Sequence, residues 1–155
     1  MKAQNVNPMF QVSEIQVSYQ PNFKASERPK IGSSKDAFDV LISCWDKDQI
    51  NLLEQCFMLV LNRANRVIGI REVSSGGYSG TVVDPKLIFG IALKCVGSSI
   101  IIGHNHPSEN LRPSTSDLDI TKKLTAAGRM LDLPVLDHLI VTAEGYYSFS
   151  DEGLI

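Results

Sequence analysis

The alternation of hydrophobic and polar positions along the chain predicts most of its strands. Residues 56–61 form a continuous apolar run, which is typical of a strand buried on both faces. A polar turn follows, and residues 66–74 then alternate, so these two segments predict a β-hairpin. Residues 81–83 predict a further short strand, and residues 98–103 predict a strand that runs directly into His104.

Three segments carry helical periodicity and begin with residues that suit a helix N-terminus. The predicted helices cover approximately residues 35–45, 85–96 and 115–131, and the last of them has its apolar residues on a single stripe. Serine and aspartate side chains can accept hydrogen bonds from the first free backbone amides of a helix. The predicted N-caps are Ser34, Asp84 and Ser114.

The order of these elements predicts an α/β fold with a mixed sheet. Residues 134–142 and 146–149 predict a final hairpin, so strands and helices mix without strict alternation and an α/β sandwich fits best. Residues 1–34 differ in character from the remainder and are predicted to form an N-terminal arm, followed by one domain over residues 35–155. In the arm, Ile15, Val17 and Tyr19 alternate as in an edge strand, which predicts self-association through the arm.

Composition and charge narrow the classes of function. The chain has 155 residues, 43% of them hydrophobic, which suffices for a core without disulfides. The formal net charge of -2 favours neither nucleic acid nor an anionic membrane as a partner. There is no apolar run of membrane-spanning length and no signal-peptide pattern at the N-terminus, so a cytoplasmic protein is expected. Its three cysteines are separated in the sequence and are expected to be buried in the core of a protein from a reducing compartment.

The segment from His104 to Asp117 carries the most informative chemistry. Side chains two residues apart on a strand point to the same side, so His104 and His106 can hold one divalent ion. Asp117 lies in the first turn of the following helix, from which its carboxylate can reach the end of the strand. Two histidines and one carboxylate with an open fourth position are typical of a catalytic zinc site, where the bound water has a pKa near 7.

Other residues are candidates for assisting this site. Glu72, near the end of an otherwise apolar strand, is the predicted general acid/base, and Ser114 is the predicted donor to an oxyanion. Each also has a structural explanation: Glu72 as a surface ion pair, and Ser114 with Asp117 as a helix capping box. His138 is predicted to be a core histidine or a residue that supports the metal site, with a third-ligand role as the alternative.

The pattern of Glu72, His104-x-His106 and Ser114-x-x-Asp117 resembles the JAMM (JAB/MPN+) signature. The segments His104-Asn105-His106-Pro107-Ser108 and Asp137-His138-Leu139-Ile140-Val141 are similar to the RadC-type branch. The resemblance implies an α/β/α sandwich like that of the cytidine deaminases, with zinc held by His104, His106 and Asp117. Glu109 stands where the RadC branch commonly has glycine.

Three functions follow as hypotheses. The first is a zinc-dependent peptidase or isopeptidase that acts on a protein or peptide substrate. The second is a DNA-processing accessory protein, for which the basic residues Lys24, Arg28, Lys30 and Lys35 are candidate phosphate contacts. The third is a non-catalytic module in which the metal stabilises the fold and the surface binds a partner.

Overall fold

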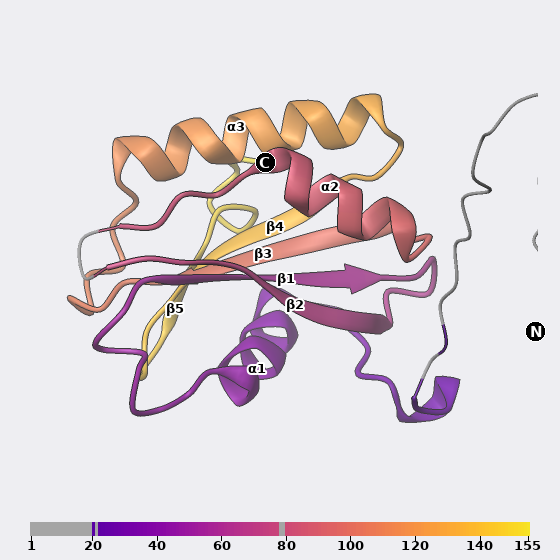
Figure 1. The fold of residues 1–155 in the computed structure, drawn as a ribbon, viewed down its shortest axis with the longest axis horizontal. Helices are drawn as coiled ribbons and strands as arrows, with labels where there is room; N and C mark the ends of the chain where they lie inside the picture. The colour runs from indigo at the N-terminus through magenta and orange to yellow at the C-terminus, as the bar shows by residue number, and fades with distance from the viewer. Residues whose placement is uncertain (1–19, 21, 78–79) are drawn as a thin grey trace, which may run out of the picture.

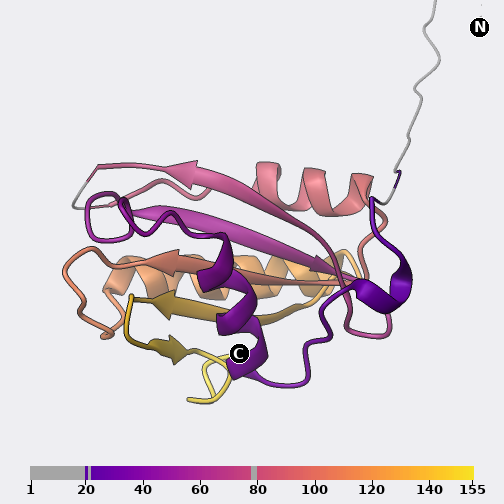
Figure 2. The same cartoon turned by 90° about the horizontal axis from the view of Figure 1, so that it is seen from below.

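The chain folds into three layers, with one mixed sheet between helices on both faces. The computed structural model describes residues 20, 22–77 and 80–155. Figure 1 shows α2 and α3 on one face of the sheet and α1 on the other, and Figure 2 shows α1 crossing the strands from below. The elements are η1 (Ala25–Glu27), α1 (Ser34–Cys44), β1 (Gln55–Leu61), β2 (Val67–Ser75), α2 (Pro85–Lys94), β3 (Ser99–Asn105), α3 (Thr115–Met130), β4 (Val135–Val141) and β5 (Tyr146–Ser148).

The strand order in the sheet is β2-β1-β3-β4-β5. β1 pairs antiparallel with both β2 and β3, β3 runs parallel to β4, and β4 forms an antiparallel hairpin with β5. These pairings confirm both predicted hairpins and the predicted α/β/α sandwich with a mixed sheet. Because β3 and β4 are parallel, their carboxyl ends meet at one edge of the sheet, beside the start of β1 and of α3 (Figure 1).

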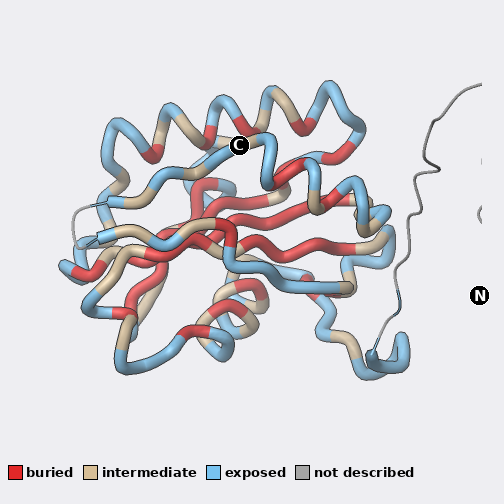
Figure 3. The backbone as a smooth tube through the Cα atoms, viewed as in Figure 1, coloured by how far each residue is buried: buried red, intermediate tan, exposed pale blue. Residues whose placement is uncertain are grey.

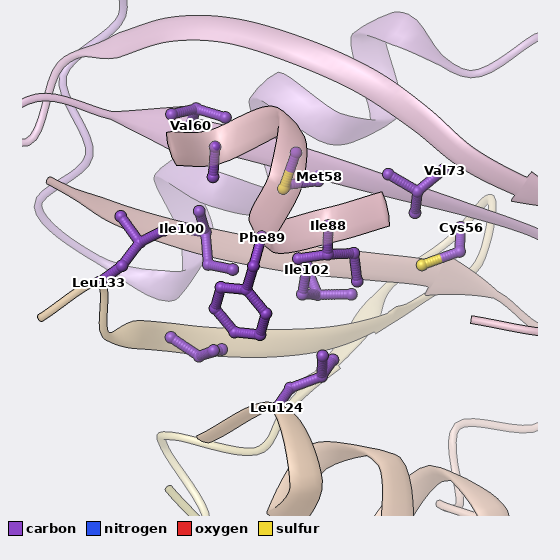
Figure 4. Packing of buried hydrophobic residues seen from close by; sticks show 12 residues of the cluster. Cys56, Met58, Val60, Val73, Ile88, Phe89, Ile100, Ile102, Leu124 and Leu133 are labelled. Atoms are coloured by element: carbon purple, nitrogen blue, oxygen red, sulfur yellow. The ribbon is translucent and has the colours of Figure 1, made fainter. Parts of the chain in front are cut away.

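Two apolar cores fill the spaces between the layers; β3 is buried along its whole length, and β1 and β4 are buried along most of theirs (Figure 3). Alternate residues of β1 supply both cores. Met58 and Val60 pack toward α2 and α3, where Figure 4 shows them near Ile88 of α2, while Leu59 packs toward Leu41 of α1. Continuous apolar strands thus serve two faces at once, as the run at residues 56–61 predicted.

The helix boundaries agree with the capping chemistry to within a few residues. Asp84 and Ser114 are N-caps as predicted, each accepting a hydrogen bond from a backbone amide of the first turn. The cap of α1 is Ser33 rather than Ser34, since the Ser33 hydroxyl accepts from the amide of Asp36. Ser34 instead donates to the carboxylate of Asp151.

Three predictions from the sequence are wrong or lie outside the described residues. The strand predicted at residues 81–83 is wrong: this segment lies outside every ladder among the described residues, and Val82 is 85% exposed. Three alternating residues cannot form a strand when no neighbouring strand offers a partner. Cys44 is exposed and Cys95 is only partly buried, against the expectation of burial, whereas Cys56 is buried. The edge strand predicted around Ile15, Val17 and Tyr19 lies outside the described residues.

Residues just before α1 belong to the folded body. Ile31 is buried in the core beneath α1, and its amide donates to the carbonyl of Asn65. Val67 at the start of β2 donates to the carbonyl of Pro29. The division of the chain at residue 34 stays a prediction. Among the helices that the structure describes, none is long and apolar enough to cross a membrane.

Candidate metal centre

Three potential metal ligands converge where β3 ends and α3 begins. His104 and His106 project from the end of β3 to the same side, as the two-residue repeat of a strand requires. Their Nε2 atoms lie 3.0 Å apart. The Asp117 carboxylate lies 3.3 Å from the Nε2 atom of His104 and 3.5 Å from that of His106.

These distances fit one tetrahedral cation. Two ligands at about 2.0–2.1 Å from a tetrahedral zinc ion are separated by about 3.3 Å. The Nε2–Nε2 separation of 3.0 Å and the separation of 3.3 Å between Nε2 of His104 and Oδ1 of Asp117 are close to this value, and Oδ2 of Asp117 lies 3.5 Å from Nε2 of His106. The three side chains form a group of metal-binding type in which every ligand atom lies within 4.8 Å of the others. The geometric prediction for His104, His106 and Asp117 therefore has the spacing that a single divalent ion needs.

The tautomer of His104 follows from a chain of hydrogen bonds that ends at a backbone carbonyl. The Thr121 hydroxyl donates to the carbonyl oxygen of Asp117 at 2.5 Å, because that oxygen can only accept. Thr121 Oγ1 therefore accepts from Nδ1 of His138 at 2.6 Å. Burial lowers the pKa of His138 well below its usual value, so the ring is neutral and its Nε2 accepts from Nδ1 of His104 at 2.8 Å. Nε2 of His104 is left with a free lone pair.

A second backbone carbonyl fixes the tautomer of His106. Its Nδ1 donates to the carbonyl oxygen of Asn110 at 2.6 Å, so in the neutral ring Nε2 carries the lone pair. Both imidazoles thus turn a lone pair toward one point, as metal-binding histidines do when their other nitrogen is hydrogen-bonded. The same contacts place His138 behind His104, where it supports the ligand instead of forming a third imidazole ligand.

Asp117 combines the capping and the ligand roles that the sequence left open. Its Oδ2 atom accepts from the amide of Ser114 at 2.7 Å, and the Ser114 hydroxyl accepts from the amide of Asp117, which completes a capping box. Burial opposes ionisation of this carboxyl, but when the rings of His104 and His106 take up protons on Nε2, their hydrogen bonds to the carboxylate outweigh burial and hold its pKa well below the usual value. The Asp117 hydrogen bond in turn raises the pKa of His106.

The three ligands lie in the wall of an open cleft of about 690 Å³. Its lining includes Thr81, Val83 and residues of the loop from Pro107 to Ser114. Ser114 lines this cleft, and because its oxygen accepts from the amide of Asp117, its O–H remains available as a donor. The cleft therefore leaves the three candidate ligands accessible from solvent.

The structure does not bring Glu72 to this cleft. Glu72 is exposed on β2 opposite Phe57, and its carboxylate accepts from the Gln55 side chain at 3.2 Å. Directly paired residues of antiparallel strands share a face, and Phe57 packs toward α1. His104 is paired with Cys56, which packs toward α2 and α3. Glu72 and His104 therefore lie on opposite faces of the sheet.

Glu54 holds the position that was predicted for Glu72. It comes two residues before Cys56, shares its face of the sheet, and is half-buried in the lining of the cleft. Its negative charge adds to the effect of Asp117 in raising the pKa of His106. A signal was present in the sequence, since a carboxylate directly before a buried apolar strand requires a partner or a task. The face of the sheet on which Glu54 lies, however, depends on the pairing of β1 with β3.

Comparison with known proteins places the chain in a family. Residues 31–154 match the RadC-like JAB domain. A UPF0758 protein of Flavobacterium johnsoniae is 46% identical over 127 residues, which cover 81% of this chain and 53% of that protein. A UPF0758 protein of Methanosarcina mazei is 32% identical over 133 residues, covering 86% of this chain and 57% of that protein.

A third relative shows the same partial overlap. The UPF0758 protein STH371 of Symbiobacterium thermophilum is 40% identical over 103 residues, 66% of this chain and 44% of its own length. The chain thus spans about half the length of the curated relatives it matches. The match over residues 31–154 includes the whole described sheet, all three ligands and the cleft. On this evidence, the chain belongs to the RadC-like JAB domain family.

Proposed function

We propose that this domain is a zinc-dependent hydrolase of peptide or isopeptide bonds, with Glu54 as its general acid/base. The observation that carries the proposal is the convergence of His104, His106 and Asp117 in the wall of an open cleft that Glu54 also lines. The domain contains the donor set, the open side and the carboxylate that metal-assisted hydrolysis requires. Zinc is the proposed ion because two imidazoles and one carboxylate suit it.

Each residue has a distinct task in this proposal. A zinc ion bound here would polarise a water molecule and lower its pKa toward neutrality. The Glu54 carboxylate accepts the proton of the attacking water and returns it to the leaving amine. The Ser114 hydroxyl donates to the oxygen of the scissile carbonyl as negative charge develops on it. His138 and Thr121 hold His104 in the tautomer that exposes Nε2.

Incubation of the zinc-loaded chain with a peptide library tests the assignment, using Glu54→Gln and Glu72→Gln as matched variants. Both changes remove one carboxylate from the same hairpin region and keep the shape of the side chain. Loss of general acid/base catalysis lowers the rate about 10²–10⁴-fold, and this loss is expected for Glu54→Gln alone. Activity that survives in Glu54→Gln, or that disappears in Glu72→Gln, would contradict the proposed role.

The DNA-processing alternative has no specific support in the fold. Lys24, Arg28 and Lys30 flank η1, which Figure 1 shows at the opposite end of the sheet from the end of β3, and Lys35 lies in the first turn of α1. Lys35 pairs with Asp39, and Arg28 contributes its backbone carbonyl to Arg66. These residues therefore do not form a basic surface that leads to the metal centre.

A further inference from the structure

The residue between the two histidine ligands makes contacts that neither histidine makes. Asn105 ends β3 between His104 and His106, and by the two-residue repeat of a strand it points away from the metal centre. Its side chain is fully buried. The partners of its side chain are Ile50 and Leu53, in the segment that joins α1 to β1, and Gln55, the first residue of β1.

Three short hydrogen bonds tie Asn105 to that segment. Its Nδ2 group donates to the carbonyl oxygens of Ile50 at 2.6 Å and Leu53 at 2.7 Å. Its Oδ1 atom accepts from the amide of Gln55 at 2.7 Å. Regular pairing of β1 with β3 begins only at Cys56 and His104, so the Asn105 side chain continues the connection one residue beyond the ladder.

These bonds enclose Glu54. The Leu53 carbonyl and the Gln55 amide belong to the two peptide groups that flank the α-carbon of Glu54. The other polar groups of those two peptides, the amide and the carbonyl of Glu54, pair with the two residues that follow β2. The Glu54 amide donates to the carbonyl of Gly77, and the Glu54 carbonyl accepts from the amide of Gly76. All four polar groups around Glu54 are therefore paired, two of them with a single side chain.

We infer that Asn105 is a positioning residue that ties Glu54 to the strand carrying the metal ligands. The tripeptide His104-Asn105-His106 then sets both halves of the site. Its outer residues supply ligands, and its central residue fixes the backbone on which the carboxylate is mounted. The acid/base role of Glu54 rests on the function proposed above. The placement of Glu54 by Asn105 does not.

A purely structural role predicts a different outcome. If Asn105 only satisfies buried carbonyls, its replacement lowers the stability of the whole domain and moves Glu54 no more than other residues. If it positions Glu54, the carboxylate shifts relative to the bound metal while the three ligands retain their affinity. A displacement of about 1 Å can reduce a catalytic rate about 10²-fold.

The test compares Asn105→Asp and Asn105→Ala with the wild-type chain, using Co²⁺ and Zn²⁺ as probes. Asp keeps the acceptor for Gln55 and loses the two donors, whereas Ala loses all three contacts. The paramagnetic shift that bound Co²⁺ induces in the ¹³C carboxyl signal of Glu54 reports its position. We expect this shift to change in both variants, and to change more in Asn105→Ala than in Asn105→Asp. The Zn²⁺ affinity of both variants should stay within about threefold of wild type.

Asn62→Asp is the matched control. Asn62 accepts hydrogen bonds from Ala64 and Arg66 in the β1–β2 turn, at the far end of β1. The same chemical change there should leave the Glu54 signal and peptide turnover as in wild type. An unchanged Glu54 signal in both Asn105 variants would overturn the inference, as would a parallel loss of Zn²⁺ affinity.

A measurement on the unaltered chain covers the case in which neither variant folds. The side-chain amide protons of Asn105 should exchange with deuterium slowly, because both have buried carbonyl partners. Exchange at the rate of an exposed amide would overturn the inference. Failure of the proposed function is distinguishable: Glu54→Gln would then retain activity, while the position of the Glu54 carboxyl would still depend on Asn105.

Discussion

Thr121 determines, at the scale of single residues, which nitrogen of His104 carries the proton in the neutral ring. The chain of hydrogen bonds from the Asp117 carbonyl through Thr121 and His138 leaves only one tautomer for each ring. Without the threonine oxygen, Nδ1 of His138 loses its acceptor and the buried ring is free to reverse its donor and acceptor. The metal ligand then depends on a residue that does not contact the metal.

Thr121→Val should therefore weaken zinc binding about 10- to 100-fold without changing any ligand. The valine is isosteric, so the helix and its packing are kept. Calorimetric titration with zinc measures the effect. Thr125→Val is the control, since the Thr125 hydroxyl is buried on the same helix without a hydrogen-bond partner among the described residues. Equal affinities for the Thr121 and Thr125 variants would contradict the tautomer mechanism.

At the scale of secondary structure, Gly103 allows α1 to approach the sheet just before the first ligand. A β-carbon at this position would lie 2.6 Å from Cδ1 of Leu41, which is fully buried on α1. The Leu41 side chain is fully buried, so a shift that admits a methyl group at Gly103 displaces Leu41 against its neighbours in the core beneath the sheet. The close contact between α1 and β3 therefore requires glycine for reasons of space.

Gly103→Ala should lower the free energy of unfolding by about 1–3 kcal/mol, as overpacking of a core does. In a Leu41→Ala background, the same change should cost much less, since the methyl group then occupies vacated space. Urea denaturation of the four proteins of this double-mutant cycle measures the coupling. Strictly additive effects would show that the two residues do not compete for the same volume.

The elements also show how far the sequence alone could go. The His-x-His spacing, the caps Asp84 and Ser114 and both hairpins depend on local patterns, and all were predictable. The choice between Glu54 and Glu72 was not predictable from such patterns. It depends on which residue of β1 pairs with His104 and on the irregular register of β1 with β2 near Cys56. The role of Asn105 likewise requires knowing that the segment before β1 lies against the end of β3.

At the scale of the whole molecule, hydrogen bonds and apolar packing orient the three candidate ligands. The ligands are oriented by hydrogen bonds to Asn110, Ser114 and His138, and two separate apolar cores stabilise the sheet. This arrangement differs from that of a zinc finger, which is unfolded until metal binds. The metal should therefore add stability to a domain that is already folded.

Removal of zinc with a chelator should leave the circular dichroism spectrum unchanged and lower the melting temperature moderately. At a free zinc concentration of 100 times its dissociation constant, binding contributes only about 2.7 kcal/mol to stability. Thermal melts with and without chelator measure the difference. Loss of secondary structure at room temperature would contradict this prediction and favour the module in which the metal holds the fold together.

X-ray absorption at the zinc edge tests the central claim most directly, because it reports the ligands of the bound ion. The zinc-loaded chain should show four light ligands at about 2.0–2.2 Å, with the scattering pattern of two imidazoles and no sulfur. His106→Ala should lose one imidazole from that pattern. A sulfur ligand, or a pattern unchanged in His106→Ala, would show that the metal does not bind at His104, His106 and Asp117.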